Sequence, residues 1–158
     1  MKSRIEYYPH FPDAFGKMVE IGKLIRSSSL GHNLIHLLNI RISQINGCIF
    51  CIDMHVKEAK IDGEKEIRLH HIAGWKESPL FDARERAAFL WAETVTLLSE
   101  NNVPDAVYEE VRSVFSEQEM VSLTMAVAHM NSWNRIAVSF RAVPGSMDKM
   151  YGLDRAGL

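Results

Sequence analysis

The feature that most limits the possible folds is a helical spacing of apolar residues that continues along nearly the whole chain. Apolar side chains recur three and four residues apart, which places them on one face of a helix. No clearly alternating segment is present, and the single Asn46-Gly47 pair sits between two helical patterns rather than between two strand patterns. The chain is therefore predicted to be all-α, with about six or seven helices. The helical segments are expected at about residues 13–27, 31–45, 48–61, 64–73, 83–98, 105–114 and 116–140.

Two of these helices have clear start signals. Asp82 is followed three residues later by Glu85, and Ser116 is followed three residues later by Glu119. This spacing is typical of a capping box, in which the two side chains and two backbone N–H groups bond reciprocally. We therefore expect helices to begin directly after Asp82 and Ser116.

The length of 158 residues suits one domain with one hydrophobic core. We expect residues 1–158 to form a single domain, with its core between about residues 15 and 142. The segment 120–130 is apolar on almost every face, so it should be buried in the bundle or covered by a second subunit, which favours a homo-oligomer. The residues after Pro144-Gly145 are expected to be loosely held.

Charge and hydropathy exclude several classes of protein. The formal net charge is −2 and there is no run of Lys or Arg, so a nucleic-acid partner is not expected. No stretch of about 18 or more apolar residues is present, as a membrane span requires. The first 15 residues lack the apolar core of a secretory signal. We therefore expect a cytoplasmic protein with no membrane partner.

The only two cysteines lie in the segment INGCIFCIDMHVKEAK, residues 45–60. Cys48 and Cys51 form a C-x-x-C pair, and His55 follows four residues after the second cysteine. In a cytoplasmic protein such a pair is more often redox-active or metal-binding than a structural crosslink. On a helix that begins near Cys48, Cys51 lies about one turn on and within disulfide reach, and His55 lies one turn beyond Cys51. All three side chains therefore share one stripe.

Two effects compete over which sulfur is the more reactive. The helix dipole and the free N–H groups at the helix start favour a thiolate at Cys48. The nearby imidazole of His55 favours a thiolate at Cys51. The residues alone leave this choice open.

Two other interpretations of the pair are open. Free cysteines are often buried as small apolar residues. A structural zinc site is the second alternative, with a fourth ligand from His32, His36, His70 or His71. Structural zinc is usually held by two paired sets of ligands, and no second C-x-x-C pair is present in the chain. We therefore expect no metal and no other cofactor.

Three segments of the chain carry a family resemblance: IRISQINGCIFCIDMHVKEA, AGWKESPLFDARERAAFLWAETVT and, more loosely, MNSWNRIAVSFR. Through them the chain resembles the alkylhydroperoxidase D-like (AhpD-like) branch of the carboxymuconolactone decarboxylase family, over about residues 15–142. The resemblance implies an all-α fold and a homo-oligomer, often a trimer or hexamer. It also implies a thiol-dependent peroxidase that reduces a small hydroperoxide and is itself reduced by a dithiol reductant protein.

The same resemblance implies roles for individual residues. Cys51 would attack the peroxide, Cys48 would resolve the product to a disulfide, and His55 would belong to a proton relay. The family commonly has a glutamate twelve residues before the first cysteine, where this chain has His36. A histidine can shuttle protons but cannot offer a negative charge to His55. We therefore expect a weaker or differently tuned relay, and a purely structural role for His36 is equally open.

Three further functions compete with the peroxidase hypothesis. One is a disulfide oxidoreductase or redox partner that acts on another protein. Another is the lyase activity that names the family, decarboxylation of a lactone-type acid, which does not need a cysteine pair. The last is a helical assembly without catalytic activity.

Overall fold

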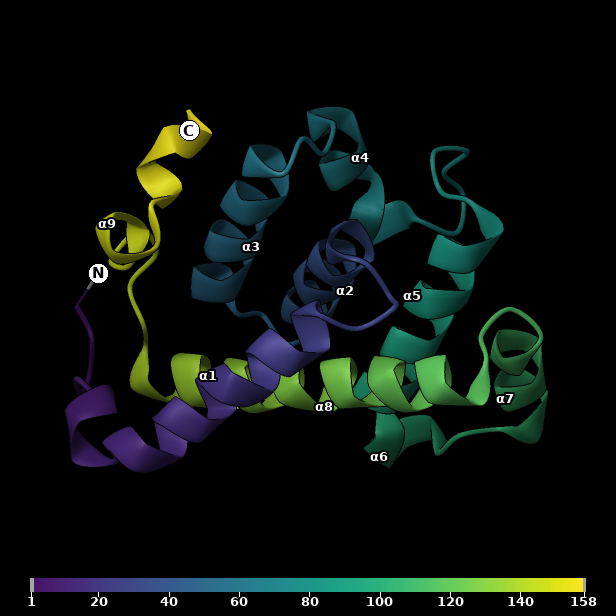
Figure 1. The fold of residues 1–158 in the computed structure, drawn as a ribbon, viewed down its shortest axis with the longest axis horizontal. Coiled ribbons are helices and arrows are strands. Elements are labelled where there is room, and N and C mark those ends of the chain that lie inside the picture. The colour runs from purple at the N-terminus through teal and green to yellow at the C-terminus, as the bar shows by residue number, and fades with distance from the viewer. Residues whose placement is uncertain (1, 158) are drawn as a thin grey trace.

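The chain is all-α in the computed structural model, which describes residues 2–157 (Figure 1). This confirms the fold class. The structure has more than the six or seven helices expected, because it includes short helices of three or four residues that an apolar pattern cannot reveal. In chain order the helices are η1 (Tyr8–His10), α1 (Pro12–Arg26), α2 (His32–Ile45), α3 (Ile49–Ile61), α4 (Glu66–His71), η2 (Ile72–Gly74), α5 (Ala83–Thr96), α6 (Leu98–Asn101), α7 (Asp105–Arg112), α8 (Glu117–Phe140), α9 (Asp148–Tyr151) and η3 (Leu153–Ala156), where η marks a 3-10 helix.

Both predicted capping boxes are present. The Asp82 carboxylate accepts from the backbone N–H of Glu85 at 2.8 Å, and Ser116 Oγ accepts from that of Glu119 at 3.3 Å. The two glutamates bond back to the N–H groups of Asp82 and Ser116. The hydrogen bond from the Ser116 backbone, helped by the Arg84 guanidinium, lowers the pKa of Glu119 to about 2. These bonds fix the starts of α5 and α8.

Helix α2 is the centre of the bundle. Leu37, Leu38, Ile40 and Ile42 are almost completely buried. Helix α2 packs against α3, α5 and α8, as expected for a helix that is apolar on several sides. Figure 1 shows the long helix α8 along one side of the molecule, with α2, α3 and α5 above it.

Helix α8 is buried on one face only. Met120, Leu123 and Met130 are buried, which agrees with the apolar pattern. Val121 and Met125, however, are 66% and 47% exposed in this single chain. The subunit contact that would cover this second face remains a prediction.

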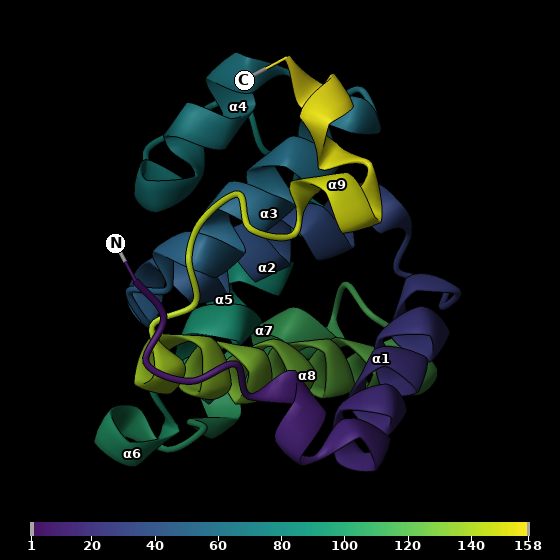
Figure 2. The same cartoon turned by 90° about the vertical axis from the view of Figure 1, so that its left-hand side faces the viewer.

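The residues after Pro144-Gly145 are bonded to α3 and lie against it, so the expectation of a loosely held end was wrong. Lys57 of α3 lies 2.8 Å from both Asp53 and Asp148, and the backbone N–H of Gly145 donates to Asp53 at 2.9 Å. Leu153 is buried, and the segment runs beside α3 in Figure 2. The local sequence did not show this because Lys57 and Asp148 are 91 residues apart.

Within the described part of the chain, none of the helices combines the length and apolar character that crossing a bilayer requires.

Candidate active site

The turn before α3 is held by a buried polar network. Gly47 has a φ of +67°, a conformation that side chains with a Cβ rarely adopt. The Asn46 side chain donates to Asn134 on α8 at 2.9 Å, and Asn134 donates to Ser43 on α2 at 3.0 Å. Because Asn134 is almost fully buried, these bonds fix the turn against α8. The turn places Cys48 at the start of α3.

Cys48 is the N-cap of α3, and its sulfur accepts the Cys51 backbone N–H at 3.3 Å. The two sulfurs lie at disulfide distance, with Cα atoms 5.4 Å apart. This separation is normal for such a bridge. Both residues are buried, but Cys51 lines a pocket that Cys48 does not line. Cys51 is therefore the cysteine of the pair that faces this space.

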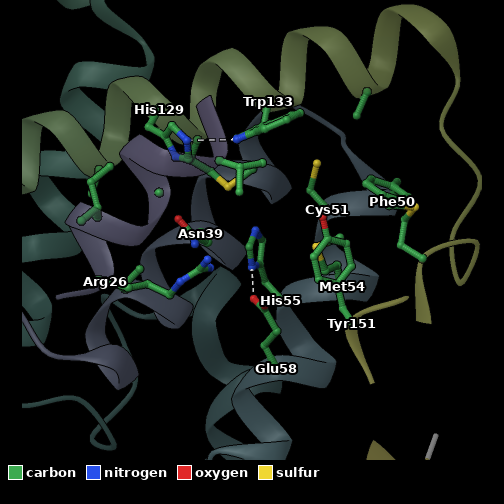
Figure 3. A pocket seen from close by; sticks show the side chains of 18 of the residues that line it. Arg26, Asn39, Phe50, Cys51, Met54, His55, Glu58, His129, Trp133 and Tyr151 are labelled. Atoms are coloured by element: carbon green, nitrogen blue, oxygen red, sulfur yellow. Dashed lines mark hydrogen bonds and ion pairs between the residues drawn. The ribbon is translucent and has the colours of Figure 1, made fainter. Parts of the chain in front are cut away.

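The pocket has a volume of about 170 Å³ and lies between α1, α2, α3 and α8 (Figure 3). Arg26, Asn39 and His129 bring polar groups to the walls, and Tyr7 and Tyr151 come from the two end segments of the chain. The rest of the lining is mostly apolar. It includes Ile25, Ile35, Phe50, Met54, Met130 and Trp133.

His55 projects into this pocket from α3, the helix that also carries Cys51. Its Nδ1 lies 2.7 Å from the Glu58 carboxylate. A carboxylate can only accept, so Nδ1 carries the proton and, in the neutral ring, Nε2 has the free lone pair. Figure 3 shows Nε2 directed into the pocket, where the Cys51 side chain also lies. The ring is thus oriented to exchange protons with a group inside the pocket.

Glu58 is a site residue that the sequence analysis missed. Burial alone would raise the pKa of Glu58, but the hydrogen bond from His55 and the nearby His55, His36 and Arg26 charges hold it below its ordinary value. Glu58 follows His55 by three residues, which places both side chains on one helical face. That spacing is the sequence signal from which a contact between His55 and Glu58 could have been predicted.

His36 lies behind Glu58 rather than in the pocket. Its Nε2 is 2.8 Å from Asp62, and its Nδ1 is 3.7 Å from Glu58, too far for a hydrogen bond. Glu58 supplies, from α3 itself, the carboxylate that His36 cannot offer to His55. The weaker or differently tuned relay stays a prediction. The four side chains follow one another in the order His55, Glu58, His36 and Asp62.

His129 reaches the pocket from α8 at a close contact with α1. Its Nε2 lies 2.8 Å from the Met18 carbonyl oxygen, and a Cβ on Gly22 would come within 3.0 Å of the ring. Burial lowers the pKa of His129 below its ordinary value, and the Arg26 and His55 charges add to this effect, against the hydrogen bond to Met18, which raises it. The His129 ring is therefore neutral at pH 7.

Replacing Glu58 by glutamine is expected to lower the free energy of unfolding by about 2 kcal/mol near neutral pH. A carboxyl whose pKa is lowered by folding stabilises the protein above its unfolded pKa of about 4.3. That contribution is lost as the pH falls through the folded pKa. The difference between wild type and Glu58→Gln should therefore shrink below about pH 4.

Urea unfolding at several pH values measures this difference. The exposed Glu77, changed to glutamine, is the matched control and should leave stability nearly unchanged. A difference of constant size across the acid range would contradict the lowered pKa.

The fold and this pocket define a class of all-α proteins with a C-x-x-C pair and a histidine on one helix. The carboxymuconolactone decarboxylase family model matches residues 11–94. The uncharacterized protein YdfG of Bacillus subtilis is 37% identical over 139 residues, which is 88% of this chain and 95% of YdfG. The chain belongs to the carboxymuconolactone decarboxylase family.

Solved structures agree with this assignment. A protein of unknown function from Agrobacterium tumefaciens, proposed to be an antioxidant defence protein of AhpD type, is 43% identical with a TM-score of 0.87. The match covers 90% of this chain and 98% of that one. A peroxidase-related protein from Ralstonia eutropha with an AhpD core shares the fold, at 20% identity and a TM-score of 0.78, over 88% of this chain and 74% of that one. The structural relatives are thus AhpD-like.

Proposed function

We propose that the chain is a thiol-dependent peroxidase that reduces organic hydroperoxides. The main observation behind the proposal is that Cys51 and His55 line the same pocket, with the Cys48 sulfur at disulfide distance from Cys51. Membership of the family and the likeness to AhpD-type proteins support it. The apolar lining favours a hydroperoxide with an organic group, because that group would be removed from water on binding.

The reaction would begin at Cys51, the cysteine that lines the pocket. His55 Nε2 takes the thiol proton, and the thiolate attacks the hydroperoxide O–O bond. The bond breaks, Cys51 becomes a sulfenic acid, and the alkoxide leaves as an alcohol after receiving the proton from His55.

Cys48 would complete the oxidative half of the cycle. Its thiol attacks the Cys51 sulfenic acid, forming the disulfide and releasing water. An external dithiol reductant, which we propose to be a protein, then restores both thiols by exchange. It has to reach Cys51 through the mouth of the pocket, since both sulfurs are nearly inaccessible elsewhere.

Glu58 and His36 would act through His55 rather than on the substrate. Glu58 holds the ring with Nε2 toward the pocket and stabilises the imidazolium that forms when the thiol is deprotonated. His36 lies one step further and adjoins Glu58 on the side away from the pocket. Both are positioning residues in this proposal.

The mostly apolar lining supports a small organic substrate over a protein disulfide, because it would bury an organic group rather than a polar backbone segment. We also propose a homo-oligomer, in which a second subunit covers Val121 and Met125 of α8.

Thiol counting on the reduced protein tests this function. Added cumene hydroperoxide should remove both thiols for each hydroperoxide consumed and yield an equal amount of cumyl alcohol. The reaction should be faster than with free dithiothreitol at the same thiol concentration. Thiols that persist, or that oxidise no faster than those of the free dithiol, would end the peroxidase proposal.

A further inference from the structure

We infer that His36, His55 and Glu58 form a binding site for one divalent transition-metal ion of the zinc type. The ligand atoms of these three residues lie within 4.8 Å of one another. Two imidazole nitrogens and one carboxylate oxygen are a donor set that zinc accepts in proteins, with a fourth position left open. The site contains neither cysteine, so it differs from the thiolate site considered in the sequence analysis.

The separations are those that such an ion requires. Ligand bonds of about 2.1 Å in a tetrahedral site place neighbouring donor atoms roughly 3.4 Å apart. The Glu58 oxygen lies 2.7 Å from His55 Nδ1 and 3.7 Å from His36 Nδ1, and these two distances bracket that value. A small movement of the Glu58 side chain would open the space between the two rings, and His55 would bind the ion as the tautomer with its proton on Nε2 rather than on Nδ1.

An unpartnered nitrogen points to the ligand. His36 is 5% exposed, and its Nδ1 is fully buried with no hydrogen-bond partner among the described residues. Such a buried polar atom is costly to leave without a bond. A metal ion between His36 and Glu58 would satisfy it.

Asp62 fixes His36 in the form that binds metal. Its carboxylate lies 2.8 Å from His36 Nε2, so that nitrogen donates and, in the neutral ring, the lone pair is on Nδ1, 3.7 Å from the Glu58 oxygen. A carboxylate behind a histidine is the usual support of a metal-bound imidazole. Glu58 and His55 also line the pocket, so a water molecule can take the open position from that side.

Metal binding would use the same His55 and Glu58 that the proposed peroxidase needs for its proton relay. Bound metal and hydroperoxide reduction are therefore expected to exclude each other. The binding itself does not depend on the proposed function, because it is measured without peroxide.

Calorimetric titration with Zn²⁺ tests the site in the Cys48→Ser/Cys51→Ser protein, which has no thiolates. One equivalent should bind. His36→Gln in this background should weaken Zn²⁺ binding at least about 100-fold, because it removes a ligand. Asp62→Asn should weaken Zn²⁺ binding about 10- to 100-fold, because it removes the carboxylate that orients the His36 ring. The exposed His70, changed to glutamine, is the matched control, and Ca²⁺ should not bind because it prefers oxygen ligands.

Each outcome decides the inference. No saturable Zn²⁺ binding, or an affinity that neither His36→Gln nor Asp62→Asn changes, overturns it. If His36→Gln does not fold, Asp62→Asn decides alone, since the Asp62 side chain is 41% exposed and its replacement is compatible with folding. Tetrahedral Co²⁺ absorption that is lost in Asp62→Asn would provide a second readout for the same variants.

Discussion

Replacing Cys51 by serine is expected to reduce the rate of hydroperoxide reduction by at least about a thousandfold. A serine hydroxyl is not ionised by a neighbouring imidazole as a thiol is, and it cannot form a sulfenic acid. The Cys48 sulfur cannot substitute, because Cys48 is buried and does not line the pocket. Consumption of cumene hydroperoxide with dithiothreitol as reductant measures the loss.

Cys48→Ser is the matched variant. It should keep the first reaction with hydroperoxide at nearly the wild-type rate but leave Cys51 as a sulfenic acid, which dimedone would trap. Steady turnover should then depend on direct reduction of that acid by the external thiol. If Cys51→Ser kept the first reaction and Cys48→Ser lost it, the two roles would be reversed.

Replacing His55 by glutamine is expected to lower the rate of hydroperoxide reduction by about 100-fold, the usual contribution of a general acid–base residue. Glutamine keeps some hydrogen bonding to Glu58 but cannot accept a proton from the thiol or return it to the alkoxide. The variant's rate should then rise with pH until the Cys51 thiol ionises by itself, near pH 8.5 for an ordinary cysteine. Wild type should reach its full rate at lower pH.

The pH profile separates this role from a structural one. His71→Gln is the control, because His71 bonds to Ser78 away from the pocket and should leave the profile unchanged. A His55→Gln enzyme that is slower but has the wild-type profile would show that the ring supports the pocket without moving protons.

The fold was largely predictable because its determinants are local. The apolar spacing of α2 and the capping boxes of α5 and α8 each lie within one helix, so a short window of sequence contains them. The short helices α6 and α9 have four residues each and carry no repeat that a window could detect. The packing of the last segment was not predictable, since it depends on the pairing of Lys57 with a residue in a distant part of the chain.

The candidate site also has a part that was predictable from local sequence and a part that was not. Cys48, Cys51 and His55 share α3, so their spacing was enough to place them on one stripe. Glu58 lies on that helix too, but a spacing of three residues from His55 does not by itself show that the two side chains bond. Arg26 and His129 could not be assigned, because α1 and α8 bring them to the pocket only after folding.

The arrangement of the chain ends has a practical consequence. Tyr7 and Tyr8 near one end and Met147 and Tyr151 near the other form walls of the pocket, while the cysteines stand on a separate helix. The residues that select the substrate can therefore be changed without changing the cysteines that react with it. Randomising these four wall positions is a direct way to change which molecules the pocket accepts. A tag fused at either terminus should be removed before rates are compared, because it lies close to these walls.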